Sequence, residues 1–357
     1  MNVENIMAIE RSHSNTINES ELIRKYKSSY KSAFIDFSIH TLMFSSALYL
    51  VWLFKNSLLS VFTIPLMVFM TNRTFIVFHD CCHQSYTPNK TLNYIISHIT
   101  GMFVLTSPNW MLDHRMHHSA NGNIENEQYQ FNETIRLTKK QFLLKTKTQQ
   151  ILYVAYQNPF VFFLMVPISY FVVLQQVKYT IIKCMYTHVF QQSLLQIAID
   201  HFVNNILSLL YLSKIYECGL LKHFIIWFSM SVSIEFVLFH NEHTFDPSYV
   251  VKNKEWTQRN SGLLGSSFIQ IPKCLKYFYM GVEYHHIHHM NTKIPGYNLQ
   301  KYHEEVVFKS NLFDNIVKLS IGDCYKNLWL VLYDEDNHKY ITFEEVYEET
   351  QNKKNIQ

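Results

Sequence analysis

Three short segments of the chain concentrate its histidines at spacings that suit metal binding. Residues 79–83 read HDCCH, so two histidines stand four positions apart. Residues 113–118 read DHRMHH and residues 285–289 read HHIHH, and each holds histidines at positions i, i+3 and i+4. On a helix such residues share one face, with Cβ atoms about 5–6 Å apart. The predicted ligands in these segments are His79, His83, His114, His117, His118, His285, His288 and His289.

His240, at the end of a later apolar block, is the ninth candidate ligand. His243 and His286 could serve as well, and spacing alone ranks them below the others. Imidazole suits iron, zinc, copper or nickel, and a single zinc ion takes at most four protein ligands. Nine histidines in one place are too many for one ion and suit two. We therefore predict a two-metal site, with no catalytic residue beyond the ligands and no residue that binds an organic cofactor.

The elements that must position these histidines include two long apolar blocks near the N-terminus. Residues 34–54 and 60–78 are each long enough to cross about 30 Å of hydrocarbon, and only KNSLL separates them. Basic residues precede the first block and place the N-terminus in the cytoplasm. The second block then returns His79 to the cytoplasmic face. Asn72 and Arg73 are costly in lipid and should face the protein or its metal site.

Further apolar blocks follow at 92–108, 159–177, 193–212 and 223–239. The first is too short to span and should be interfacial or re-entrant. If all histidine clusters share one face, an even number of crossings must separate the second cluster from His240, so the last three blocks cannot all span. The block at 193–212 carries Asp200, His201, Asn204 and Asn205. We therefore expect that block to be interfacial or half-inserted.

These blocks predict an all-α integral membrane protein with two transmembrane helical hairpins. About four spans and some interfacial helices would carry a histidine-rich cap on the cytoplasmic face. The first hairpin is expected at 33–78, and the other membrane segments within 159–240. The predicted divisions of the chain are a cytoplasmic N-terminal segment at 1–32, one domain at 33–345 and a polar tail at 346–357.

Composition argues against other classes of protein. The formal net charge is only +3 and no run of five basic residues occurs, so nucleic-acid binding is not expected. The 6 cysteines lack the spacing of a disulfide framework or a zinc finger, which indicates free thiols in a reducing compartment. The first twenty residues have no apolar core and are not a cleaved signal peptide.

The chain resembles the membrane fatty acid desaturase family. The segments HDCCHQSY, HRMHHSANGN and EYHHIHHMNTKIPGYNL match the family's three histidine boxes in order, and the likeness covers roughly residues 33–345. Gly122-Asn123 and the stretches 265–289 and 331–343 favour the acyl-lipid branch that contains the omega-6 (Δ12) enzymes. The resemblance makes the nine histidines, His240 among them, the ligands of a diiron centre.

Two departures from the family pattern stand out. Cys82 occupies a position where this branch commonly has Gly, and the residues after His240 read NEHTFD. The second departure leaves open whether His240 alone, or His243 with it, serves the metals.

The resemblance also implies the reaction and its partners. Two irons would reduce O₂ with two external electrons and introduce a cis double bond into an acyl chain held on phospholipid, coenzyme A or a carrier protein. Since no His-Pro-Gly-Gly haem motif occurs, the electron donor should be a separate ferredoxin or cytochrome b5. The membrane would be the endoplasmic reticulum or a bacterial inner membrane. Acidic residues beside the boxes are candidates to orient the imidazole N–H groups; they are Asp80, Asp113, Glu242 and Glu283.

Two alternative functions stay open at this point. A fatty acyl hydroxylase, acetylenase or carotenoid oxygenase could use the same scaffold, because the same iron pair supports each reaction. A non-catalytic metal-binding or transport protein would instead need histidines distributed along a path through the spans, whereas these cluster at predicted span ends. The acidic stretch 334–345 imitates a calcium loop but has Lys339 where the loop needs Gly, so calcium binding is not expected.

Overall fold

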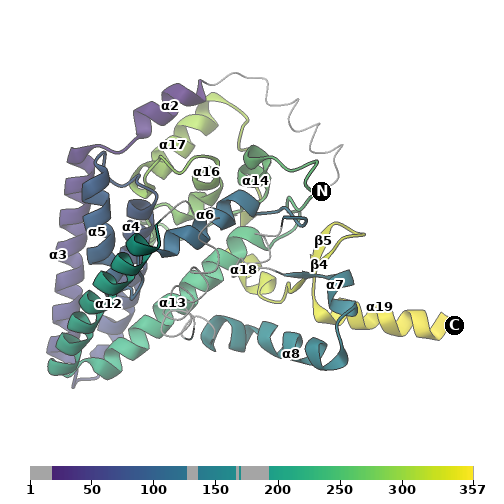
Figure 1. Ribbon diagram of the computed structural model, residues 1–357, viewed down its shortest axis with the longest axis horizontal. Helices are drawn as coiled ribbons and strands as arrows, with labels where there is room; N and C mark the ends of the chain where they lie inside the picture. The colour runs from purple at the N-terminus through teal and green to yellow at the C-terminus, as the bar shows by residue number, and fades with distance from the viewer. Residues whose placement is uncertain (1–17, 127–135, 166–168, 170–192, 357) are drawn as a thin grey trace.

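The computed structural model describes residues 18–126, 136–165, 169 and 193–356, and these residues are mostly helical (Figure 1). The helices are α2 (Glu19–Tyr26), α3 (Tyr30–Phe54), α4 (Ser60–Cys82), α5 (Lys90–Phe103), α6 (Trp110–Ala120), α7 (Lys139–Leu143), α8 (Lys147–Gln157), η2 (Val161–Met165), α12 (Leu194–Glu217), α13 (Leu221–His243), α14 (Gln258–Leu264), α15 (Lys276–Tyr279), η4 (Val282–Tyr284), α16 (His285–Met290), α17 (Gly296–Lys309), α18 (Ile321–Asn327) and α19 (Phe343–Ile356). The strands are β1 (Leu137–Thr138), β2 (Phe268–Ile269), β3 (Lys318–Leu319), β4 (Leu332–Asp334) and β5 (Lys339–Ile341).

Four of the described helices, α3, α4, α12 and α13, are long and apolar enough to cross a membrane. Helices α3 and α4 form one hairpin through a short turn, and α12 and α13 form the other. Their outer faces carry apolar side chains: Phe34 is 74% exposed and Phe202 is 65% exposed. Such faces are stable only against lipid or a partner. The predicted class, an all-α membrane protein with two hairpins, is confirmed.

The block at 193–212, which we expected to be interfacial, forms one of the four described helices that are long and apolar enough to span a membrane. This block forms most of α12, a helix of 24 residues. Its polar residues Asp200, Asn204 and Ser208 recur every fourth position and are buried. Tyr94 of α5 donates a hydrogen bond to the Asp200 carboxylate at 2.6 Å. These three polar groups thus face protein, whereas His201 and Asn205 on the same helix are half-buried.

If helices α12 and α13 both cross the membrane, they give the even number of crossings expected between the second histidine cluster and His240. Most of the block at 159–177 lies outside the described residues, so its predicted membrane insertion stays a prediction. Helix α5 has 14 residues, in keeping with the short segment expected there.

Asn72 and Arg73 of α4 face the protein, as predicted. Arg73 is 2% exposed, pairs with Asp36 of α3 and donates to the backbone carbonyl of Tyr277. Its guanidinium also lies 4.1 Å from the centre of the Tyr277 ring. The Asn72 side chain accepts a hydrogen bond from Ser231 of α13. These contacts fix α3, α13 and α15 around α4.

A small sheet ties the C-terminal region to the rest of the chain. Its strand order is β1-β4-β5, with β1 parallel and β5 antiparallel to β4. The Tyr333 hydroxyl donates to the carbonyl of Val250 at 3.3 Å, and the Tyr340 amide donates to Asp246 at 3.0 Å. The sheet therefore supports the loop after α13, whose residue Val251 pairs with Asn123 just beyond α6.

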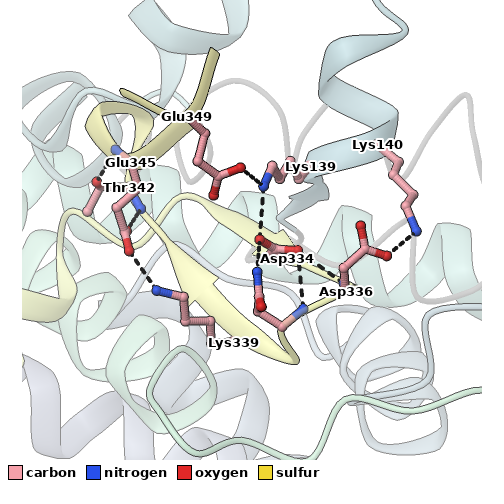
Figure 2. Close-up of polar contacts among 9 residues, drawn as sticks. Lys139, Lys140, Asp334, Asp336, Lys339, Thr342, Glu345 and Glu349 are labelled. Carbon is pink, nitrogen blue, oxygen red and sulfur yellow. Dashed lines mark hydrogen bonds and ion pairs between the residues drawn. The ribbon is translucent and has the colours of Figure 1, made fainter. Parts of the chain in front are cut away.

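Asp334 is the buried charge at the centre of this sheet. Figure 2 shows its carboxylate facing the Lys139 ammonium, at 3.0 Å, with Glu349 on the other side of the same lysine. Burial acts to raise the pKa of Asp334, but hydrogen bonds from Asn337 and Lys139 outweigh it and hold the pKa at about 2. The pair therefore stabilises the sheet above the pKa of an unfolded aspartate, about 3.9. That contribution is lost as the pH falls through about 2.

We predict that Asp334→Ala lowers the free energy of opening this sheet by about 2 kcal/mol. The substitution leaves the largely buried Lys139 without one of its two carboxylate partners. Asp336→Ala is the matched control. It removes an ion pair with Lys140 whose side chains are 59% and 69% exposed, and should cost less than about 0.5 kcal/mol. Hydrogen exchange at the β4 and β5 amides measures both changes. Equal exchange rates in the two variants would contradict the prediction.

Candidate metal centre

The histidines of the three boxes converge from helices that are distant in sequence. Helix α4 ends at the first box, α6 carries the second and α16 carries the third. Two groups form, each with one ligand atom per residue within 4.8 Å of the others. The first group is His79, His83, His114, His118 and His288, and the second is His117, His243, His285 and His289. The groups touch, since the rings of His118 and His289 lie 4.2 Å apart.

Neighbouring ring nitrogens face each other at distances that suit two ligands of the same metal ion. Nε2–Nε2 distances are 2.9 Å for His79–His114, 3.0 Å for His114–His118 and 3.0 Å for His118–His288. In the second group, the distances are 3.1 Å for His117–His289 and 2.9 Å for His243–His285. Metal–nitrogen bonds of about 2.0–2.1 Å place two neighbouring ligands of an octahedral ion about 3.0 Å apart. The donor set therefore fits two metal ions, one in each group.

Burial keeps these imidazoles in the form that binds metal. Desolvation, reinforced by neighbouring histidines, lowers the pKa of the ligand histidines of α6 and α16 well below the ordinary value. The pKa of His83 is lowered for the same reasons. A metal ligand must be a neutral imidazole, so the site does not have to lose protons before an ion binds.

His243, rather than His240, completes the second group. The Nδ1–H of His243 donates to the carbonyl of Gly265 at 3.0 Å, and its Nε2 faces Nε2 of His285. A hydrogen bond from one ring nitrogen to a carbonyl is the usual way to orient the other toward a metal.

His240 lies one turn earlier on α13 and is not brought together with the other eight predicted ligands. Its Nδ1 accepts from the Arg136 guanidinium at 2.6 Å, and its Nε2 donates to the carbonyl of Asn327 at 2.7 Å. Both ring nitrogens of His240 are thus engaged by other groups.

Asp80 orients His79 and also joins the first box to the third. Its carboxylate contacts Nδ1 of His79 at 3.2 Å and accepts from the backbone amide of Gly296 at 2.6 Å. A Cβ on Gly296 would stand 2.4 Å from the carbonyl of Met280, so no larger residue fits there. The Pro295-Gly296 turn after the third box is therefore needed for this close approach.

The other acidic candidates divide into different roles. Glu242 lies with its carboxylate 3.4 Å from Nδ1 of His285. Glu283 instead pairs with Lys276 at 3.5 Å. Asp113 lines the cavity described next.

An apolar cavity opens onto the histidines from one side. Its wall includes five histidines from both groups: His79, His114, His117, His285 and His288. The remaining wall is largely apolar, with Phe75, Phe236, Leu238, Phe239 and Leu299 among its residues. The cavity thus places an apolar ligand directly beside the predicted metals.

Comparison with known proteins identifies this arrangement. The model of the family described as fatty acid desaturase matches residues 40–309, which is most of the chain. The chain belongs to the fatty acid desaturase family. The protein is accordingly a desaturase, an oxidoreductase, and the family together with the histidine groups implies iron at this site.

Individual relatives agree with the family. The chain is 28% identical to a protein named fatty acid desaturase from Bacillus subtilis (strain 168), over 76% of this chain and 74% of the relative. It is 42% identical over 55 residues to an sn-1 acyl-lipid omega-3 desaturase (ferredoxin) from Nostoc sp. (strain 36), 15% of either chain. Over 55 residues it is also 36% identical to the acyl-lipid omega-3 desaturase (cytochrome b5) of the endoplasmic reticulum of Arabidopsis thaliana, 15% of this chain and 14% of the relative.

We predict that His243→Ala lowers the amount of bound metal and that His240→Ala does not. Loss of His243 removes one of four nitrogens from the second group and should weaken that ion at least about tenfold. The purified variant should then retain close to half the metal of the wild type. His240→Ala should keep nearly all of it. Elemental analysis of the purified proteins checks both outcomes, and the reverse pattern would assign the ligand role to His240.

Proposed function

We propose that this protein uses a diiron centre, O₂ and two external electrons to introduce a cis double bond into the acyl chain of a membrane lipid. The observation that carries the proposal is the pair of histidine groups beside one apolar cavity. A saturated C–H bond offers no acidic proton, so the bond-breaking chemistry must come from a cofactor. When bound, the irons supply the reduction of O₂ and the removal of two vicinal hydrogens.

The proposed ligands are the eight box histidines together with His243. Five nitrogens in the first group exceed the four ligands typical of zinc and suit an ion of higher coordination number, such as iron. Trp110 stacks on His114 with ring centres 4.4 Å apart and holds that ring in place. Asp80 and Glu242 would offset part of the metals' positive charge through the rings that they contact.

The cavity residues would position the acyl chain and exclude water. Phe75 lies on α4, and Phe236 and Phe239 lie on α13, so the cavity wall is built from two candidate membrane spans. An acyl chain could therefore pass from the bilayer to the metal site along apolar surface. Because this wall would exclude water, the C–H bonds of the acyl chain would be the groups nearest to the metal site.

The relatives' names and the distribution of charge support the proposed substrate class and membrane face. The names of the two relatives that match over 55 residues support an acyl-lipid substrate and a ferredoxin or cytochrome b5 donor. The omega-6 position is our sequence-based proposal, whereas those names specify omega-3. Lys25, Lys27 and Lys31 precede or begin α3 and support a cytoplasmic location for the histidines, which lie at the same end of the hairpins.

We predict that the wild type adds a double bond to host lipids and that His289→Leu does not. His286→Leu is the matched control: it lies on the same helix, packs against His303 and Phe313, and belongs to neither group. Leucine preserves bulk at both positions, so the control should retain activity.

The measurement is a fatty-acid profile by gas chromatography–mass spectrometry in a host that makes monounsaturated but no diunsaturated lipids. A new diene would support the proposal and locate its double bond. A new hydroxy acid would move the function to a diiron hydroxylase. Dienes made by membrane-inserted His289→Leu would contradict the metal-ligand assignment.

A further inference from the structure

A second opening reaches the metal centre from a side that the apolar cavity does not use. This pocket is lined by His83, His118 and His289, none of which lines the apolar cavity. It meets both histidine groups, since His83 and His118 belong to the first and His289 to the second. The centre is therefore approached from two sides by surfaces made of different residues.

The chemistry of the second opening is polar and cationic. Arg115 and Lys293 line it together with Gln258, Ser119 and Asn291, and no carboxylate is among its lining residues in the described part of the chain. Both cations are exposed at the surface. Cys82 and Met290 add some apolar surface, but the two unopposed cations favour an anionic partner over an acyl chain.

The two cations are fixed to the elements that carry the ligands. Arg115 follows His114 on α6 and precedes His118 by three positions. Lys293 follows α16, where the Asn291 side chain accepts from the Lys293 amide at 3.0 Å. Gln258 of α14, which also lines this pocket, donates to the backbone carbonyl of His289 at 3.3 Å. A partner that paired with both cations would sit directly over His118 and His289.

We propose that this pocket, framed by Arg115 and Lys293, is the docking site for the electron donor, a small acidic one-electron carrier. The inference rests on the proposed function, which needs two electrons from outside the chain. The acyl chain occupies the apolar cavity, so electrons must arrive from another side, and this pocket exposes ligands of both metals. Carboxylates around the carrier's redox centre would pair with the two cations, as in other transient, charge-steered redox encounters.

The proposed docking site would supply the electrons for the desaturation reaction. Two reduced carriers each lose one electron at the pocket. Those two electrons, two protons and the two hydrogens removed from the –CH₂–CH₂– unit convert one O₂ into two waters, leaving –CH=CH–. The docked carrier thus supplies the two electrons that the reaction needs.

The first test measures binding, without any turnover. Full-length protein in lipid nanodiscs is titrated with oxidised plant-type ferredoxin and, separately, with the oxidised soluble domain of cytochrome b5. The test variant is Arg115→Glu with Lys293→Glu. The control is Lys147→Glu with Lys326→Glu, which reverses two exposed charges on α8 and α18 instead.

At least one carrier should bind the wild type with a Kd that rises with salt. The test variant should bind that carrier at least about tenfold more weakly, because two attractions become repulsions. The control should change the Kd less than about twofold. Neutral Arg115→Gln with Lys293→Gln should fall between the two. Unchanged binding by the test variant, or no binding of either carrier to the wild type, would overturn the docking site.

Kinetics separate a docking role from damage to the centre. With the carrier as reductant, the test variant should show a raised KM for the carrier and a nearly unchanged kcat. With dithionite as reductant, wild type and test variant should perform equally, and equal loss with both reductants would overturn the inference. A wild type that binds the carrier but forms no double bond would refute the proposed function and leave the docking site standing.

Discussion

The rest of the structure depends on one constraint. Many neutral imidazoles must be buried side by side, with the lone pairs of their ring nitrogens facing one another. Facing Nε2 atoms lie 2.9–3.1 Å apart, and such an arrangement is favourable when a cation lies between them. The surrounding structure holds the rings there by other means. Trp110 stacks on His114, Asp80 contacts His79 and the Gly265 carbonyl accepts from His243. Preorganisation of this kind lets the site present its ligands without rearrangement.

Helix α13 connects the membrane to this site. Its apolar residues form one wall of the apolar cavity, and its last turn carries Glu242 and His243. The helix also packs against α4, where Ser231 bonds to Asn72. A shift of α13 would therefore move the cavity wall and the second metal group together. The contacts that fix α13 in rotation and depth serve both parts of the proposed reaction, substrate placement and metal binding.

Much of the site could be predicted from the sequence because its geometry is local. The spacing of His114, His117 and His118 makes one face of a helix whatever the tertiary fold, and the same holds for the third box. The choice between His240 and His243 is not local. These residues lie three positions apart on α13, and the contacts that separate their roles come from Arg136, Asn327 and Gly265, far away in sequence.

The sequence-based expectation for α12 did not identify it as a candidate span, for a similar reason. Summed hydropathy counts Asp200 and Asn204 against a membrane helix wherever their side chains point. In the structure, these residues and Ser208 share one buried face, and α5 supplies the hydroxyl of Tyr94 to the carboxylate. The periodicity of four was visible in the sequence, but the partner on α5 was not. A polar stripe needs such a partner before it can be distinguished from a solvent-facing one.

The central claim is that two ions lie in two separate histidine groups, and anomalous X-ray diffraction at the iron edge tests it most directly. Crystals of the iron-loaded protein should show two peaks. One should lie among His79, His83, His114, His118 and His288, and the other among His117, His243, His285 and His289. A single peak, or a second peak beside His240 in place of His243, would contradict the account.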